Sequence, residues 1–245
     1  MNIWALILCL FLSVQINASS KTIDGKELTG HKVIKKVSLF NTKINDLRIF
    51  FAETTGNVKA SIEDVTKVVL AFDQRCNNKY VNKRRFTSKK LKCIHHNQNL
   101  VESFVIRDFK KVEKTPDNEI DRFLIYRNIY NRNSYQYYDL VTVREVNNKL
   151  GKKKRIISYG MLTKKELKKY IENPLEIKTA FNYAGGKYIL TEMSKNVVSL
   201  KMEYTSKTDH WLLNSGIAVG TIYEKIAKGT NATLENIIKA SEASR

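Results

Sequence analysis

Apolar side chains recur along the chain at two spacings, three-to-four residues and two residues, and these predict helices and strands respectively. The first helical stripe lies in the segment 61–72 and consists of Val65, Val68, Val69 and Phe72. Ser61 precedes this stripe, and Asp64 comes three positions after Ser61, which is the spacing of an N-terminal capping box. We therefore expect a helix over 61–72 with one buried face.

Enrichment in β-branched and aromatic residues predicts a series of strands on either side of this helix. The expected strands cover residues 46–52, 102–109, 122–130, 135–146 and 155–162. A further segment, 197–204, alternates apolar and polar residues, as a half-buried strand does. Turns are expected at 54–57 and at Gly185-Gly186.

The remaining helical signals lie late in the chain. Thr163 and Glu166 form a second capping box, which opens a short helix that ends before Pro174. A C-terminal helical stripe runs from Leu213 to Ile238, with an interruption expected at 229–231. Consecutive strands joined by short turns, with helices between and after them, predict the α+β class: a curved antiparallel sheet with helices packed on one side.

The N-terminal segment has the pattern of a secretion signal. Residues 3–14 are almost wholly apolar, no charged residue precedes Lys21, and the small residue Ala18 ends the run. A run of about a dozen residues is shorter than the roughly 20 needed to span a bilayer. We expect a signal peptide over 1–18, a flexible lead-in over 19–45 and one folded domain over 46–245, exported to the periplasm or the extracellular space. An uncleaved anchor or a buried first helix is the alternative.

The chain is strongly basic, with a formal net charge of +19. Such a charge favours polyanionic partners, including anionic lipid head groups and nucleic acid. Bases concentrate in the segment 75–92, where the candidate membrane or polyanion face consists of Lys79, Lys83, Arg84, Arg85, Lys89 and Lys90. Tyr80 and Phe86 lie among them, an arrangement that also occurs in single-strand nucleic-acid binders. For an exported protein we favour an anionic membrane over nucleic acid, and a simply solvated face remains open.

Two cysteines follow the expected signal peptide, Cys76 and Cys93. In an oxidising compartment they could form one disulfide, which would stabilise the fold by about 3 kcal/mol. A bridge and two separate buried thiols are equally compatible with this spacing.

Segments near both ends of the chain resemble the START-like superfamily of helix-grip lipid-binding domains (SRPBCC, Bet v1-like). Residues 49–73 resemble the opening strand and the first helix of that family, 197–209 resembles its last long strand, "HWLLN" at 210–214 resembles the opening of its long C-terminal helix, and "ATLENIIKA" at 232–240 resembles the end of that helix. The central strands depart from the pattern. The Pro-rich turn and the Arg-Asp pair of the family are absent there, and Tyr138-Asp139 stands near that place.

The resemblance implies a curved antiparallel sheet that grips a long C-terminal helix, with one or two short helices and an apolar cavity between sheet and helix. Members of the family commonly bind or transfer a lipid, a sterol or another hydrophobic ligand, and a minority catalyse cyclisation or hydrolysis. Candidate pocket residues at positions that could face the cavity are Tyr126, Tyr138, Leu200, Met202, Tyr204, Trp211, Leu213, Ile217 and Ile222. Ordinary packing in the core is the alternative for each.

Motifs of common enzyme classes are missing from the sequence. It has no G-x-S-x-G elbow, no H-E-x-x-H, no Cys-x-x-Cys and no Gly-rich phosphate loop. His95 and His96 have no neighbouring ligands that would complete a metal site, so we expect no metal and no cofactor. Asp209-His210 is an acid–base candidate, with helix capping by Asp209 as the alternative.

The sequence therefore predicts a non-catalytic, exported carrier of a lipid or other hydrophobic ligand, monomeric, with a basic face for anionic membranes. Two alternatives remain open. One is a secreted effector that binds polyanions through its basic face, and the other is a START-like cyclase or hydrolase.

Overall fold

The computed structural model describes residues 21–23, 25–72, 75–76, 95–96, 100–109, 118–131, 133–147, 151–175, 177–179 and 181–244. Its helices are α2 (Ile62–Leu70), α3 (Lys164–Leu167), α4 (Trp211–Asn214) and α5 (Val219–Glu242). The short strands are β1 (Thr22–Ile23), β2 (Lys26–Glu27), β6 (Arg75–Cys76) and β7 (His95–His96). The main strands are β3 (Thr29–Ile34), β4 (Val37–Ile44), β5 (Leu47–Val58), β8 (Leu100–Asp108), β9 (Glu119–Asn131), β10 (Asn133–Asn147), β11 (Lys153–Met161), β12 (Tyr183–Ser194) and β13 (Val197–Thr208).

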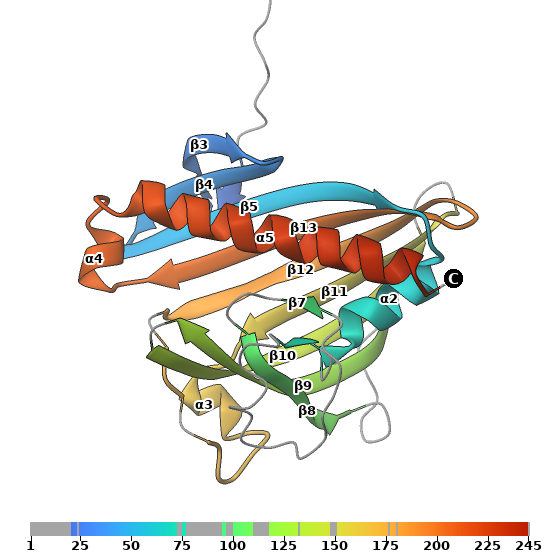
Figure 1. The fold of residues 1–245 in the computed structure, drawn as a ribbon. Helices are drawn as coiled ribbons and strands as arrows, with labels where there is room; N and C mark the ends of the chain where they lie inside the picture. The colour runs from blue at the N-terminus through green and yellow to red at the C-terminus, as the bar shows by residue number, and fades with distance from the viewer. Residues whose placement is uncertain are drawn as a thin grey trace, which may run out of the picture.

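The main strands form one antiparallel sheet in the order β3-β4-β5-β13-β12-β11-β10-β9-β8. The N-terminal and C-terminal strands meet inside the sheet, because β5 pairs with β13 along residues 48–58 and 198–208. The long helix α5 runs across β5 and β13, and α2 lies beside the C-terminal end of α5 (Figure 1). The expected class, a curved antiparallel sheet that grips a long C-terminal helix, is confirmed.

Two predicted helix starts are observed with their caps. The Ser61 hydroxyl accepts a hydrogen bond from the backbone N–H of Asp64 at 3.1 Å, so α2 begins where the sequence predicted. Thr163 and Glu166 form a complete capping box at the start of α3, and the Thr163 N–H donates to the Glu166 carboxylate at 2.8 Å. Both caps satisfy backbone donors that the first turn leaves unpaired.

Several local predictions were wrong. Residues 54–57 are not a turn, because β5 continues through them and pairs with β13. Gly185 and Gly186 lie inside β12. The helix is not interrupted at 229–231, since α5 is continuous, but it begins only at Val219, after a separate helix α4.

The expected flexible lead-in over 19–45 also needs correction within its described part. Residues 29–44 form β3 and β4, which extend the sheet beyond β5. Val37 and Leu39 are fully buried in a cluster with Phe50 and Tyr223 of α5. Val37 and Leu39 are two positions apart, so both point to the same face of β4.

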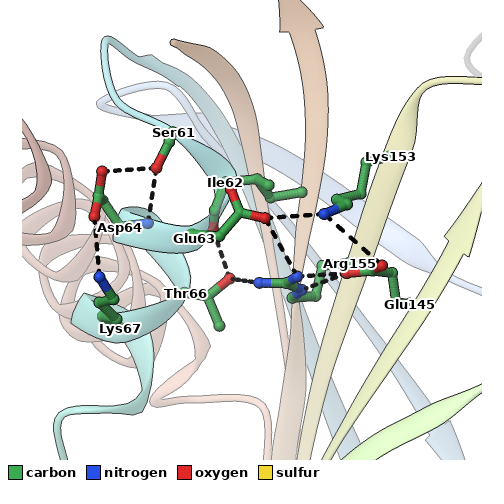
Figure 2. A network of polar contacts seen from close by, with 9 residues as sticks. All are labelled: Ser61, Ile62, Glu63, Asp64, Thr66, Lys67, Glu145, Lys153 and Arg155. Carbon is green, nitrogen blue, oxygen red and sulfur yellow. Dashed lines mark hydrogen bonds and ion pairs between the residues drawn. The ribbon is translucent and has the colours of Figure 1, made fainter. Parts of the chain in front are cut away.

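A polar network fixes α2 to the sheet (Figure 2). The Arg155 guanidinium on β11 donates to the Thr66 hydroxyl on α2 at 2.9 Å and also bonds the Glu145 carboxylate on the neighbouring strand β10. Lys153 donates to the Glu63 carboxylate at 2.9 Å. That hydrogen bond lowers the pKa of Glu63 and raises the pKa of Lys153.

We predict unequal effects for two substitutions in this network. Arg155 is buried and bonds two partners, so Arg155→Ala should lower the free energy of unfolding by about 1–3 kcal/mol. Lys153 and Glu63 are partly exposed, so Lys153→Ala should cost less than about 1 kcal/mol. Urea unfolding followed by circular dichroism measures both. Equal losses would show that burial does not decide the strength of these contacts.

Candidate functional site

The sheet face that looks toward α2 and α5 is lined by one continuous apolar cluster. It contains alternate residues of β5, β9, β10, β11, β12 and β13, together with residues of both helices. Gly56 on β5 allows α5 to approach closely, because a Cβ there would lie 3.0 Å from the Ile238 side chain and 3.3 Å from the Leu234 side chain. We call this the inner face.

Three predicted pocket residues lie on the inner face. Leu200 and Met202 are buried in its apolar cluster, and Tyr204 is the next residue of β13 on the same side. Tyr204 packs against the neighbouring cluster of β4, β5 and α5, which also includes Ile222. The structure therefore brings these four predicted residues to the region between sheet and helix.

Tyr126 and Tyr138 lie on the opposite face of the sheet. They belong to a separate core with Leu162 and Leu167, and their ring centroids are 5.3 Å apart. The Tyr138 hydroxyl accepts a hydrogen bond from the Leu175 backbone N–H at 2.7 Å, so it stabilises the segment packed on this opposite face. Alternation explains the placement, because Ile125 and Asp139, their chain neighbours, are the residues that point inward.

The pocket residues predicted at the start of the long helix also lie elsewhere than expected. Trp211 is 75% exposed and Ile217 is 89% exposed, while Leu213 is partly buried. The apolar stripe predicts one helix from 213 onward, but α4 ends at Asn214 and Gly216 has a φ of +87° before α5 begins. This break changes the helical phase, so Trp211 and Ile217 do not face the sheet.

The inner face carries an ion pair between Arg127 on β9 and Asp139 on β10. Both side chains are almost fully enclosed, with 11% and 2% of their surface exposed. The sequence pattern does not predict this ion pair. The two residues are twelve positions apart and meet only because Arg127 pairs with Tyr137 across the β9–β10 hairpin.

Tyrosines surround this ion pair. The Arg127 guanidinium lies 5.8 Å from the centre of the Tyr159 ring. The Tyr159 and Tyr188 ring centroids are 5.5 Å apart. Tyr137 and Tyr204 complete the group, which we call the polar cluster: Arg127, Asp139, Tyr137, Tyr159, Tyr188 and Tyr204. Gly186 makes room beside Tyr159, because a Cβ there would lie 2.7 Å from the Tyr159 hydroxyl and 2.0 Å from the Glu203 carbonyl oxygen.

The electrostatics of the polar cluster follow from its burial. Burial alone would lower the pKa of Arg127, but the Asp139 carboxylate and the neighbouring tyrosines together outweigh burial, and the pKa is raised. Burial, reinforced by the Asp139 charge, raises the pKa of Tyr137. Burial also raises the pKa of Tyr159 and of Tyr204. The cluster therefore holds one balanced ion pair and neutral hydroxyl groups at physiological pH.

Asp209 and His210 are both exposed. The Asp209 carboxylate accepts a hydrogen bond from the Asn182 side-chain amide at 3.2 Å, and the His210 ring lies beside Trp211. His210, and not Asp209, occupies the N-cap position of α4, and it makes no side-chain cap there. The structure thus shows neither a buried acid–base pair nor the expected cap at this place.

Other candidates fall on residues without a description. Cys93 and the candidate basic face lie outside the described residues, and Cys76 is described only as part of strand β6. Within the described ranges, no group of three or more His, Cys, Asp or Glu side chains could hold a metal ion. None of the helices that the structure describes is long and apolar enough to cross a membrane.

Comparisons of the sequence find no family model and no curated protein that matches. Among solved structures, a STAR-related lipid transfer protein from Xanthomonas axonopodis is 14% identical, with coverage of 87% of this chain and 97% of that chain and a TM-score of 0.47. Human StAR-related lipid transfer protein 5 is 10% identical, with coverage of 98% and 94% and a TM-score of 0.48. The Zhui aromatase/cyclase from Streptomyces is 11% identical, with coverage of 79% and 94% and a TM-score of 0.42.

The deciding observation is the architecture itself, in which a curved antiparallel sheet with β5 paired to β13 grips the C-terminal helix. The chain has a START-like helix-grip fold. In this START-like fold, "ATLENIIKA" lies at the end of the long helix, as the resemblance predicted. "HWLLN" does not open that helix, because its residues Trp211–Asn214 form the separate helix α4.

Proposed function

We propose that this protein is an exported, non-catalytic binding or carrier protein for a lipid or another hydrophobic ligand. The observation that carries the proposal is the composition of the inner face, where a continuous apolar wall adjoins the enclosed polar cluster. Sites for amphiphilic small molecules combine these two features, apolar lining for the body and a few placed polar groups for the head.

The depth of the polar cluster supports a site there. Burial raises the pKa of Tyr137, Tyr159 and Tyr204, yet each of these residues retains intermediate exposure. Surface that remains accessible next to deeply placed hydroxyl groups is the expected property of a hollow between sheet and helices. Each methylene group of a ligand that leaves water for the apolar wall would contribute about 0.8 kcal/mol.

The charges of the cluster favour a particular head group. Asp139 already neutralises Arg127, so a ligand that brought its own net charge would disturb a balanced buried pair. The remaining groups are tyrosine hydroxyls, which donate and accept hydrogen bonds. We infer that the ligand carries a neutral hydroxyl or carbonyl head and an acyl, sterol or similar apolar body.

The proposed source of the ligand is a membrane with anionic lipids. The net charge of +19 attracts such a surface, at about 1 kcal/mol for each well-placed Lys or Arg. Export through the signal peptide over 1–18 would place the protein in the periplasm or the extracellular space. We further propose that it acts as a monomer without a cofactor.

The test is organic extraction of the purified protein, expressed with its leader, followed by mass spectrometry of the extract. We expect a reproducible, near-stoichiometric lipid with a neutral polar head that a control protein does not yield. A blank extract, repeated after incubation with mixed liposomes, would overturn the proposal and favour the alternative of a polyanion-binding effector.

A variant connects the extracted lipid to the polar cluster. Arg127→Met combined with Asp139→Leu removes both charges together and keeps similar volume, so the fold should persist. We expect the lipids that this variant retains to have less polar head groups than those that the unaltered protein retains. Lys153→Ala, which removes a partly exposed ion pair of the α2 network, serves as the matched control and should leave the extracted lipids unchanged. Identical extracts from all three proteins would place the head group elsewhere.

A further inference from the structure

Two large apolar side chains project from the loop between β13 and α5. Trp211 and Ile217 have the highest exposed fractions, 75% and 89%, of the large hydrophobic side chains that the structure describes. Trp211 is the first residue of the four-residue helix α4 and Ile217 follows this helix, which lies beyond the end of the sheet and on the side away from α2 and the C-terminus (Figure 1). We call this region, residues 210–217, the α4 tip.

The α4 tip is held in place by its neighbours. The Nε and Nη2 atoms of Arg48 on β5 both donate to the Asn214 carbonyl oxygen at 3.1 Å. The Asn214 side-chain amide donates to the Asp46 carbonyl oxygen at 2.6 Å, and Arg48 is itself fixed by the Asn41 side chain at 2.8 Å. A fixed loop that exposes tryptophan presents this side chain in a defined direction, and its exposure is not the result of a loosely attached segment.

The small apolar area of the α4 tip and the positive charge of the chain favour a lipid surface as its binding partner. A stable protein interface buries about 1,200–2,000 Å², far more than two exposed side chains can supply. A second copy of the chain would bring another charge of +19 and be repelled. A bilayer requires no matching pocket, and tryptophan partitions to its interface, where the ring contacts acyl chains and the indole N–H stays near water.

We propose that the α4 tip docks the protein onto anionic lipid bilayers by inserting Trp211 and Ile217 into the membrane interface. The net positive charge attracts the protein to the surface, and the two apolar side chains then anchor it. This inference rests on the proposed function only for the role of the membrane as ligand source. Docking itself needs no ligand between sheet and helix, so the two proposals fail separately.

The test uses tryptophan as its own reporter. The chain has two tryptophans, so Trp4→Phe in the full-length protein leaves Trp211 as the only one. Vesicles of phosphatidylcholine with phosphatidylglycerol should shift the Trp211 emission to the blue, and bromine-labelled acyl chains should quench it. Vesicles of phosphatidylcholine alone should produce a weaker response because they lack the negative charge.

Co-sedimentation with the same vesicles measures the anchor. Trp211→Ala combined with Ile217→Ala should bind at least about tenfold more weakly. Met193→Ala is the matched control, because Met193 is 50% exposed near the end of β12, by the turn into β13, and this variant should bind like the unaltered protein. Binding by the leader would be equal in both variants. Sedimentation without any change in Trp211 emission, or equal binding by both variants, would overturn the proposal.

Discussion

Asp139→Ala should lower the free energy of unfolding by about 3–5 kcal/mol, the largest loss that we expect from a single substitution in this protein. The substitution removes the carboxylate but leaves the Arg127 guanidinium enclosed on the inner face, where only 11% of its surface is exposed. Water cannot fully solvate that charge, and the surrounding tyrosine rings cannot replace the lost partner. Urea unfolding at neutral pH, followed by circular dichroism, measures the loss.

The double substitution Arg127→Met, Asp139→Leu separates the value of the pair from the cost of breaking it. Replacement of both charges by apolar side chains leaves no unpaired ion, so most of the loss should be recovered. If the double variant is as unstable as Asp139→Ala alone, the loss does not come from an uncompensated charge. A small loss in Asp139→Ala would mean that water reaches Arg127.

Alkaline pH should destabilise the protein steeply, beginning at about pH 10. In the unfolded chain a tyrosine ionises with a pKa of about 10, whereas burial raises the pKa of Tyr137, Tyr159 and Tyr204 in the folded protein. Their contribution is fully present below about pH 10. Above it, the unfolded state loses protons that the folded state keeps, so the free energy of unfolding falls by about 1.4 kcal/mol per pH unit for each tyrosine.

Chemical unfolding at a series of pH values between about 8 and 12 measures this slope. Tyr137→Phe, Tyr159→Phe and Tyr204→Phe together should reduce the slope by about 4 kcal/mol per pH unit. Tyr170→Phe, outside the polar cluster, is the control and should leave most of the slope in place. A slope that is the same in both variants would contradict the expected burial of the cluster hydroxyls.

Local patterns predicted local structure well. Each of the caps at Ser61 and Thr163 involves two residues three positions apart, so the sequence pattern is enough to predict them. Alternation along 197–204 predicted β13, and it also predicted which side of that strand holds Leu200 and Met202. The class of fold followed from the order of such elements.

The wrong predictions concern local structure that depends on contacts with distant parts of the chain. Residues 54–57 have turn-like composition, yet β13 provides partners for them and extends β5. The Arg127–Asp139 pair depends on the register of the β9–β10 hairpin, which sequence spacing alone does not fix. Trp211 is a predicted pocket residue in a segment that resembles the opening of the long helix, but the break before α5 leaves its side chain exposed.

The pairing of β5 with β13 has a consequence for how the chain folds. These strands are separated by about 150 positions in the sequence, and β3 and β4 join the sheet only through β5. The Tyr223 hydroxyl of α5 also donates to the Gly30 carbonyl oxygen at 2.8 Å. The unit formed by β3, β4 and β5 therefore joins the rest of the sheet only after the last strand has been synthesised. Such long-range pairing slows folding, and it delays completion of the sheet until translation is nearly complete.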